Sequence, residues 1–221
     1  MKNLLLAFLM IGMTMNVFAQ KGIEGIDFNK SDIERAVDIV HNSKRSSQVQ
    51  QAITFFESAA TDEGVDWLPV YYAAYSNALM SSMVTEAGVR DAHLNQAQTY
   101  IDEAKLISPD NDEILLVQAY IYQMRIDINP TVRAKEYTPM AQAAFKEAEL
   151  INPDNPRLYF LQAQSSFFSD DLNNMGMREA CPMINRAAEL FNDFKPETKL
   201  HPKWGKEMNM FMIRMCERIN R

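Results

Sequence analysis

Glycine and cysteine are both scarce in this sequence. Of its 221 residues, only 7 are glycine and 2 are cysteine. The small number of glycines, together with abundant Ala, Leu, Met, Glu and Gln, favours helix over strand. Two cysteines alone are too few for a structural metal site, which usually has four protein ligands. We therefore predict an all-α protein that holds no metal.

Dense runs of basic residues are also missing. The chain has 22 Lys and Arg residues against 29 Asp and Glu residues, a formal net charge of −7. Nucleic acids and anionic lipid surfaces both reward clustered positive charge. We therefore expect neither of them to be a partner of this chain.

The sequence carries no recognisable catalytic motif. Its three histidines, His41, His93 and His201, are scattered and form neither an HExxH motif nor an i, i+4 ligand pair. GxSxG, a glycine-rich phosphate loop and CxxC are absent. We expect a non-enzymatic protein without a cofactor. An enzyme would instead need polar groups that converge in a pocket, for example around His93 or paired carboxylates.

Two other groups of residues resemble metal ligands at first sight. The acidic run at 110–113 coincides with an expected turn and helix cap, and it lacks the glycine and distal glutamate of a calcium loop. Met208, Met210 and Met212 lie two residues apart, so on a helix they point to different faces and do not converge on a copper ion. We predict that these methionines pack in the core.

The N-terminus has the layout of a secretory signal peptide. Lys2 precedes an uncharged apolar run over residues 4–15, and Val17-Phe18-Ala19 is a small-x-small cleavage signal. The run is short for a bilayer span, which needs about 20 apolar residues. We expect residues 1–19 to be removed and the mature chain, from Gln20, to be periplasmic or secreted. The alternative is a retained membrane anchor.

The rest of the chain repeats a small, large, small triplet at helical spacing. After a loose lead-in over residues 20–30, the triplet occurs four times: Ala52, Phe56, Ala59; Ala97, Ile101, Ala104; Ala141, Phe145, Ala148; and Ala180, Ile184, Ala187. Positions i, i+4 and i+7 lie on one helical face. Two antiparallel helices approach to about 8–10 Å when small side chains lie at their crossing. Each triplet therefore predicts the second helix of a hairpin.

This pattern resembles the tetratricopeptide repeat (TPR), in which small residues lie where two helices touch and a proline closes the unit. Pro109 and Pro153 follow two of the triplets. The resemblance implies that residues 31–221 form an all-α, right-handed TPR-like superhelix of about four helical hairpins with a C-terminal capping helix. The alternative is a generic helical bundle with alanine-rich contacts.

Several boundaries are expected to depart from a regular repeat. Residues 128–131 should break the first helix of the third unit, and Thr138 and Pro139 should be the cap and first residue of its returning helix. Residues 169–176 are expected to form a loop before a helix over 179–194. Asp66 should cap a helix that begins at Trp67. The last helix, over 204–219, has no partner and should cap the stack.

A narrower resemblance is to small exported TPR proteins of Bacteroidota-type bacteria, and it spans most of the mature chain. The residues that carry it are Trp67-Leu68-Pro69 with Tyr72-Ala73-Ala74, Asn155-Pro156-Arg157, Ala180-Cys181-Pro182, Phe194-Lys195-Pro196, and His201-Pro202 with Trp204-Gly205. This resemblance supports the repeat fold and export.

The two cysteines are placed to meet. Cys181 lies near the start of one predicted helix, and Cys216 lies near the end of the next. In an antiparallel hairpin, residues equally far from the turn lie opposite each other, and the midpoint of this pair falls inside the connection at 195–202. An exported chain would form the disulfide. The alternative is two buried free thiols.

The first helices of the repeats are expected to line a concave groove. Counted from each turn, the inward positions include Glu113 and Arg157 and nine further residues that we take as the partner-binding set: Leu68, Tyr71, Tyr75, Leu116, Tyr120, Gln123, Phe160, Gln164 and Phe167. This strip is aromatic and aliphatic, and it lacks the Lys/Asn set with which some co-chaperone TPR domains clamp a carboxylate. An open apolar strip of this kind suits a peptide or amphipathic helix.

The sequence thus predicts an exported, non-catalytic TPR scaffold that holds a protein or peptide partner in the cell envelope. A long connection, the lead-in segment or the capping helix could fill the groove instead. The alternative function is a carrier of a small apolar ligand or lipid in a closed helical cavity.

Overall fold

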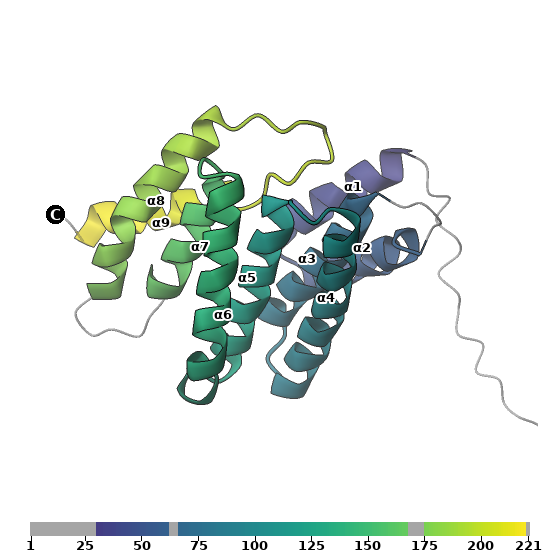
Figure 1. The fold of residues 1–221 in the computed structure, drawn as a ribbon, viewed down its shortest axis with the longest axis horizontal. Coiled ribbons are helices and arrows are strands. Elements are labelled where there is room, and N and C mark those ends of the chain that lie inside the picture. The colour runs from purple at the N-terminus through teal and green to yellow at the C-terminus, as the bar shows by residue number, and fades with distance from the viewer. Residues whose placement is uncertain (1–29, 62–65, 168–174, 220–221) are drawn as a thin grey trace, which may run out of the picture.

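The computed structural model describes residues 30–61, 66–167 and 175–219, and every regular element within them is a helix. The expected signal peptide (1–19), nearly all of the lead-in segment and most of the loop at 169–176 lie outside these residues. The helices are α1 (Lys30–Asn42), α2 (Ser46–Ala59), α3 (Trp67–Met83), α4 (Ala87–Ile107), α5 (Asp112–Ile128), α6 (Pro130–Ile151), α7 (Pro156–Phe167), α8 (Met175–Asp193) and α9 (Lys206–Ile219) (Figure 1). The all-α prediction is confirmed.

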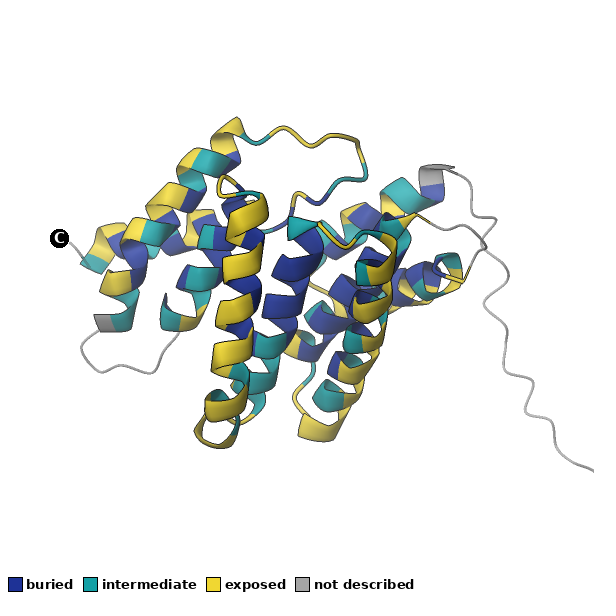
Figure 2. Ribbon diagram, in the orientation of Figure 1, coloured by how far each residue is buried: buried dark blue, intermediate teal, exposed yellow. Residues whose placement is uncertain are grey.

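Consecutive helices pack as hairpins, and the hairpins pack on one another. α3 lies against α4, α5 against α6 and α7 against α8, while α3, α5 and α7 follow one another along the inside of the array. The last helix, α9, packs against α8. Figure 2 shows that α5 is buried along its first turns, whereas α4 and α6 expose one face each. That the array is a right-handed TPR superhelix stays a prediction.

The alanine triplets lie at the helix contacts, as predicted. Ala97 and Ala104 on α4 and Ala180 and Ala187 on α8 are fully buried. Small side chains at these positions let two helix backbones approach closely while the large residue between them fills the neighbouring space. Ala59 is the exception, because α2 ends there and Ala60 is buried instead.

Enlarging one of these alanines should destabilise the fold. Ala97→Leu adds three carbon atoms at a position that is 0% exposed, and overpacking of a buried site costs about 1–3 kcal/mol. Ala92→Leu is the matched control, because Ala92 lies on the exposed face of the same helix. Urea unfolding followed by circular dichroism would measure both. Equal stability of the two variants would contradict the assignment of Ala97 to a helix contact.

Helix boundaries agree with the predicted caps at α3 but not at α6. The Asp66 side chain accepts a hydrogen bond from the Trp67 N–H, as expected of an N-cap. The prediction that α6 begins at Pro139 is wrong, because Asn129 caps it and Pro130 is its first residue. Pro139 lies inside the helix on its exposed side, where water can hydrogen-bond the carbonyl group that a proline leaves unpaired.

α8 also begins earlier than predicted, at Met175, and α9 begins later, at Lys206. The connection between α8 and α9 therefore covers residues 194–205 and includes Trp204. Among the described residues, no helix combines the length and the apolar character needed to cross a bilayer.

Candidate functional site

The nine residues of the expected partner-binding strip lie on α3, α5 and α7, but the strip is covered. Eight of them are 0–9% exposed: Leu68, Tyr71, Tyr75, Leu116, Tyr120, Gln123, Phe160 and Phe167. The ninth, Gln164, is half-buried. Of the two alternatives left by the sequence, an open strip or a filled one, the described structure has the filled one. Over Tyr75, Tyr120 and Phe160 the covering segment is the 194–205 connection.

Trp204 is the part of the connection that enters the strip. Its ring stacks on Tyr75 with centroids 4.5 Å apart and an interplanar angle of 17°, and the centroids of Tyr120 and Phe160 lie at 6.3 and 6.4 Å. Its indole N–H donates a hydrogen bond of 2.8 Å to the Tyr71 hydroxyl oxygen. We call these four rings, Tyr71, Tyr75, Tyr120 and Phe160, the aromatic box. The inner face thus already packs against one flat nitrogen heterocycle, the indole ring of the chain's own Trp204.

Gly205 allows the connection to pass close to the neighbouring rings. Its φ of 98° lies in the left-handed region that glycine adopts readily. A Cβ atom at this position would meet Phe191 at 3.1 Å and Phe160 at 3.2 Å. A side chain here would strain the backbone and push these rings apart.

A buried ion pair lies beside the aromatic box. Glu113 on α5 and Arg157 on α7 are 2% and 0% exposed. The Arg157 Nε–H donates to Glu113 Oε2 at 2.8 Å, and Asn155 donates to Glu113 Oε1 at 2.6 Å. The guanidinium carbon lies 4.6 Å from the ring centroid of Phe194 and 5.8 Å from that of Trp204. The Arg157 guanidinium therefore packs against two aromatic rings of the 194–205 connection.

Arg157 keeps its positive charge although it is buried. Burial alone would lower the pKa of Arg157, but the Glu113 carboxylate beside it raises that pKa above its ordinary value. Both residues were predicted to lie on the inner face, but their pairing was not predicted. Opposite charges at matching positions of successive first helices were the signal that could have identified the pair.

His41 on α1 and Tyr72 on α3 hold the other side of the connection. The Tyr72 hydroxyl donates a hydrogen bond of 2.7 Å to the Leu200 carbonyl oxygen and lies 3.2 Å from His41 Nε2. Because a hydroxyl has one hydrogen, His41 Nε2 must carry its own hydrogen and donate it to the Tyr72 oxygen. Burial, with Lys203 and Arg157 nearby, lowers the pKa of His41 to about 3, so its imidazole is neutral.

A shallow pocket of about 270 Å³ opens next to His41, between α1 and the connection. Its lining is mostly polar and carries both signs of charge: Glu34, Val37, Asp38, His41, Asn42, Lys199 and Lys203. An apolar ligand gains little from such a lining. The aromatic box is therefore the better candidate site.

The neutral state of half-buried His41 makes stability depend on pH. Its pKa is about 3 in the folded protein against 6.5 for an exposed histidine, so the unfolded chain binds more protons between these values. The contribution of neutral His41 to the free energy of unfolding is therefore complete above pH 6.5, and it is lost as the pH falls from 6.5 towards 3. We expect a loss of about 1–2 kcal/mol between pH 7 and pH 5. Urea unfolding at both pH values would measure it.

The matched variant for this prediction is His41→Gln, which keeps a hydrogen-bonding group but does not titrate. The loss of stability should shrink in this variant, although a part will remain because burial also lowers the pKa of His93. An unchanged loss in His41→Gln would contradict the assignment to His41.

No metal site emerges from the remaining candidates. Among the described residues, no three His, Cys, Asp or Glu side chains are placed to hold a metal ion. His93 pairs with the Asn77 side chain at 2.9 Å. Met212 is buried as predicted, but the prediction of core packing is wrong for Met208 and Met210, which are 44% and 49% exposed on α9.

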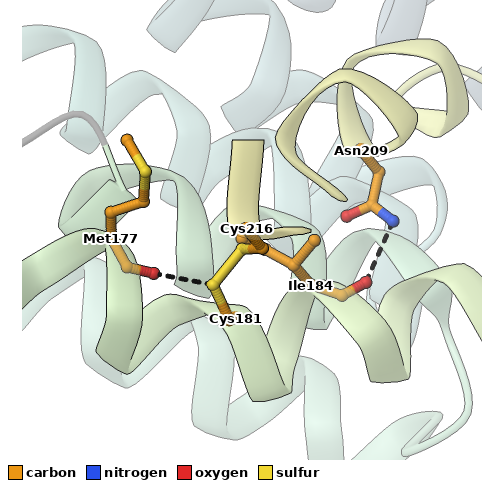
Figure 3. Close-up of a disulfide and its surroundings, with 5 residues drawn as sticks. All are labelled: Met177, Cys181, Ile184, Asn209 and Cys216. Atoms are coloured by element: carbon orange, nitrogen blue, oxygen red, sulfur yellow. Dashed lines mark hydrogen bonds between the residues drawn. A yellow bond between two sulfur atoms is a disulfide. The ribbon is translucent and has the colours of Figure 1, made fainter. Parts of the chain in front are cut away.

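The disulfide between Cys181 and Cys216 is present, as predicted. The sulfur atoms are 2.05 Å apart and the Cα atoms 5.9 Å apart, so the bond joins α8 to α9 (Figure 3). In the same region the Asn209 side chain donates a 3.0 Å hydrogen bond to the Ile184 carbonyl oxygen. The alternative of two free thiols is excluded, and the bond ties together the two helices that the 194–205 connection joins.

No known family model matches the chain, and no curated protein matches it. Among solved structures, the chain is similar to the HusA haemophore from Porphyromonas gingivalis, with 23% sequence identity and a TM-score of 0.74. The match covers 86% of this chain and 94% of the haemophore chain. At this identity the likeness establishes that the two chains share a helical fold.

Proposed function

We propose that this protein is an exported, non-catalytic carrier of a flat, apolar small molecule of the porphyrin class. The ligand would be cargo that binds at the aromatic box. The observation that carries the proposal is the stacking of Trp204 on Tyr75, with its N–H bonded to Tyr71. A face that accepts an indole in this way has the rings and the acceptor that suit a pyrrole-based macrocycle.

Two further observations support the carrier. The chain shares its fold with a protein described as a haemophore. Its disulfide is of the kind that forms in oxidising compartments, in line with export to the periplasm or beyond. A peptide scaffold using the same strip is less well supported, because the solved structure that shares the fold is described as a haemophore.

The proposal can be tested by titrating the disulfide-bonded protein with hemin and following the Soret absorbance. We expect saturable binding of one ligand per chain and coelution of ligand and protein in gel filtration. Tyr75→Leu with Tyr120→Leu, which keeps apolar volume but removes two rings, should weaken binding by about tenfold or more. Circular dichroism would verify that this variant stays helical.

Hemin adheres to exposed apolar surfaces, so a surface control is needed. Leu106 and Leu150 are 86% and 77% exposed on α4 and α6. Leu106→Ser with Leu150→Ser should leave the affinity unchanged. Absence of saturable binding to the native protein, or an equal loss of affinity in both double variants, would refute the proposal.

A further inference from the structure

We propose that the 194–205 connection is a built-in occupant of the ligand site, and that a porphyrin-class ligand binds by displacing Trp204 from the aromatic box. This inference rests on the proposed function and adds a mechanism of access to it. The connection then acts as a strap that keeps the box filled until the ligand arrives.

The contacts of the connection are concentrated at a few points. Pro202 and Trp204 are its buried residues, whereas Lys195, Glu197 and Lys199 are exposed. Two side-chain hydrogen bonds tie it to α3, one from Tyr72 to the Leu200 carbonyl and one from the Trp204 indole to Tyr71. A segment held in this way can lift locally without unfolding the helices beneath it.

Helices α8 and α9 stay joined to each other when Trp204 lifts. Cys181 and Cys216 join α8 to α9, and the bond from Asn209 to the Ile184 carbonyl adds a second link between these helices. Gly205, with its φ of 98°, lies directly before α9 and has the backbone freedom that a pivot needs. Lifting Trp204 therefore does not require α9 to detach.

Buried acceptors beside the aromatic box point to a ligand larger than the indole. Gln123 follows Tyr120 by about one turn on α5, and Gln164 follows Phe160 by about one turn on α7. Their side-chain oxygens are buried and have no hydrogen-bond partner among the described residues, and Gln123 is only 9% exposed. Buried acceptors of this kind are usually paired. A ligand that extends past the position of Trp204 and carries N–H or O–H donors could satisfy them.

A ligand can bind only those molecules in which the box is empty. The apparent affinity is therefore the affinity for the empty box multiplied by the fraction of molecules in that state. Removing the indole should therefore tighten binding, and Trp204→Ala is expected to bind hemin about tenfold or more tightly than the native protein. If Trp204 instead formed part of the ligand contact, the same change would weaken binding. Phe211→Ala is the matched control, because Phe211 is an aromatic residue 41% exposed on α9. Its affinity should equal that of the native protein.

A second measurement follows Trp204 itself and does not depend on the stability of Trp204→Ala. The chain has two tryptophans, so Trp67→Phe labelled with 5-fluorotryptophan reports on Trp204 alone. Gallium(III) protoporphyrin is a suitable probe because it is diamagnetic. The shift of the fluorine resonance between H₂O and D₂O measures contact of the ring with water. This solvent isotope shift should be near zero without ligand and should approach the value of unfolded protein when the probe is bound.

The outcomes separate this inference from the proposed function. If the native protein binds the porphyrins while the Trp204 fluorine stays shielded from water, or if Trp204→Ala binds hemin more weakly, the strap is refuted and the carrier function stands. If the native protein binds no porphyrin, the carrier function falls and the strap falls with it.

Discussion

Replacing Glu113 with glutamine is expected to destabilise the protein by about 3–5 kcal/mol, because it leaves the guanidinium of Arg157 buried without a counter-charge. The change preserves side-chain volume, so the loss is one of charge and not of packing. Arg157 is 0% exposed and cannot reach water without moving Phe194 and Trp204, whose rings lie against it. Urea unfolding followed by far-ultraviolet circular dichroism would measure the loss.

The matched control is the ion pair between Arg133 on α6 and Asp91 on α4. Its side chains are 25% and 31% exposed, so Asp91→Asn should cost less than about 1 kcal/mol. The double variant Glu113→Leu, Arg157→Met should recover part of the stability lost in Glu113→Gln, because it removes both charges together. A cost in Glu113→Gln no greater than in Asp91→Asn would contradict the view that the Arg157 charge is uncompensated without Glu113.

The same ion pair links stability to the candidate site. The Arg157 guanidinium packs against the rings of Trp204 and Phe194. Tyr71 and Tyr72 on α3 form hydrogen bonds with the same connection. A variant that disturbs Arg157 should therefore loosen the connection before the helical array unfolds. The fluorine label on Trp204 would report this loosening as an increased solvent isotope shift in Glu113→Gln without any ligand.

Local spacing explains why the hairpins could be predicted. In the triplet Ala97, Ile101, Ala104, the interval from residue to residue alone determines that all three face one side of a helix. Burial of these residues then follows from pairing with the neighbouring helix. Pro139 was misread because a proline is compatible both with the first turn of a helix and with an exposed interior position.

The covering of the strip could not be derived from spacing, because it depends on where a connection lies in space. The inward positions on α3, α5 and α7 were identified, but nothing in the helical period shows that residues 194–205 fold over them. A signal was nevertheless present in the connection itself. Pro202 lies outside every predicted helix and Trp204 follows it at the predicted start of the last one, and a tryptophan at such a helix end must be buried somewhere or mark a binding surface.

Removing the disulfide should have the second large effect on stability. The bond links residues separated by 35 positions, and closing a loop of this length stabilises by about 3–4 kcal/mol in the chain-entropy model. For a chain of this size, Cys181→Ala with Cys216→Ala should lower Tm by roughly 10 °C. Thermal unfolding with and without a reducing agent would measure the difference.

Reductant provides the internal control for that experiment. It should lower the Tm of the native protein to near that of the double variant and leave the double variant unchanged. A native Tm that does not respond to complete reduction, verified by thiol titration, would refute the predicted contribution.

Without the disulfide, α9 should unfold before the rest of the helical array does. This helix packs against α8 and exposes Met208 and Phe211 on its outer face. With little apolar area buried on that side, α9 depends on the bond to Cys181 more than the inner helices do. In the double variant, amide hydrogen exchange should therefore rise first in α9 and in residues 194–205, while α3 and α5 stay protected. Equal acceleration in all helices would mean that the bond stabilises the whole array and not the segment that closes the aromatic box.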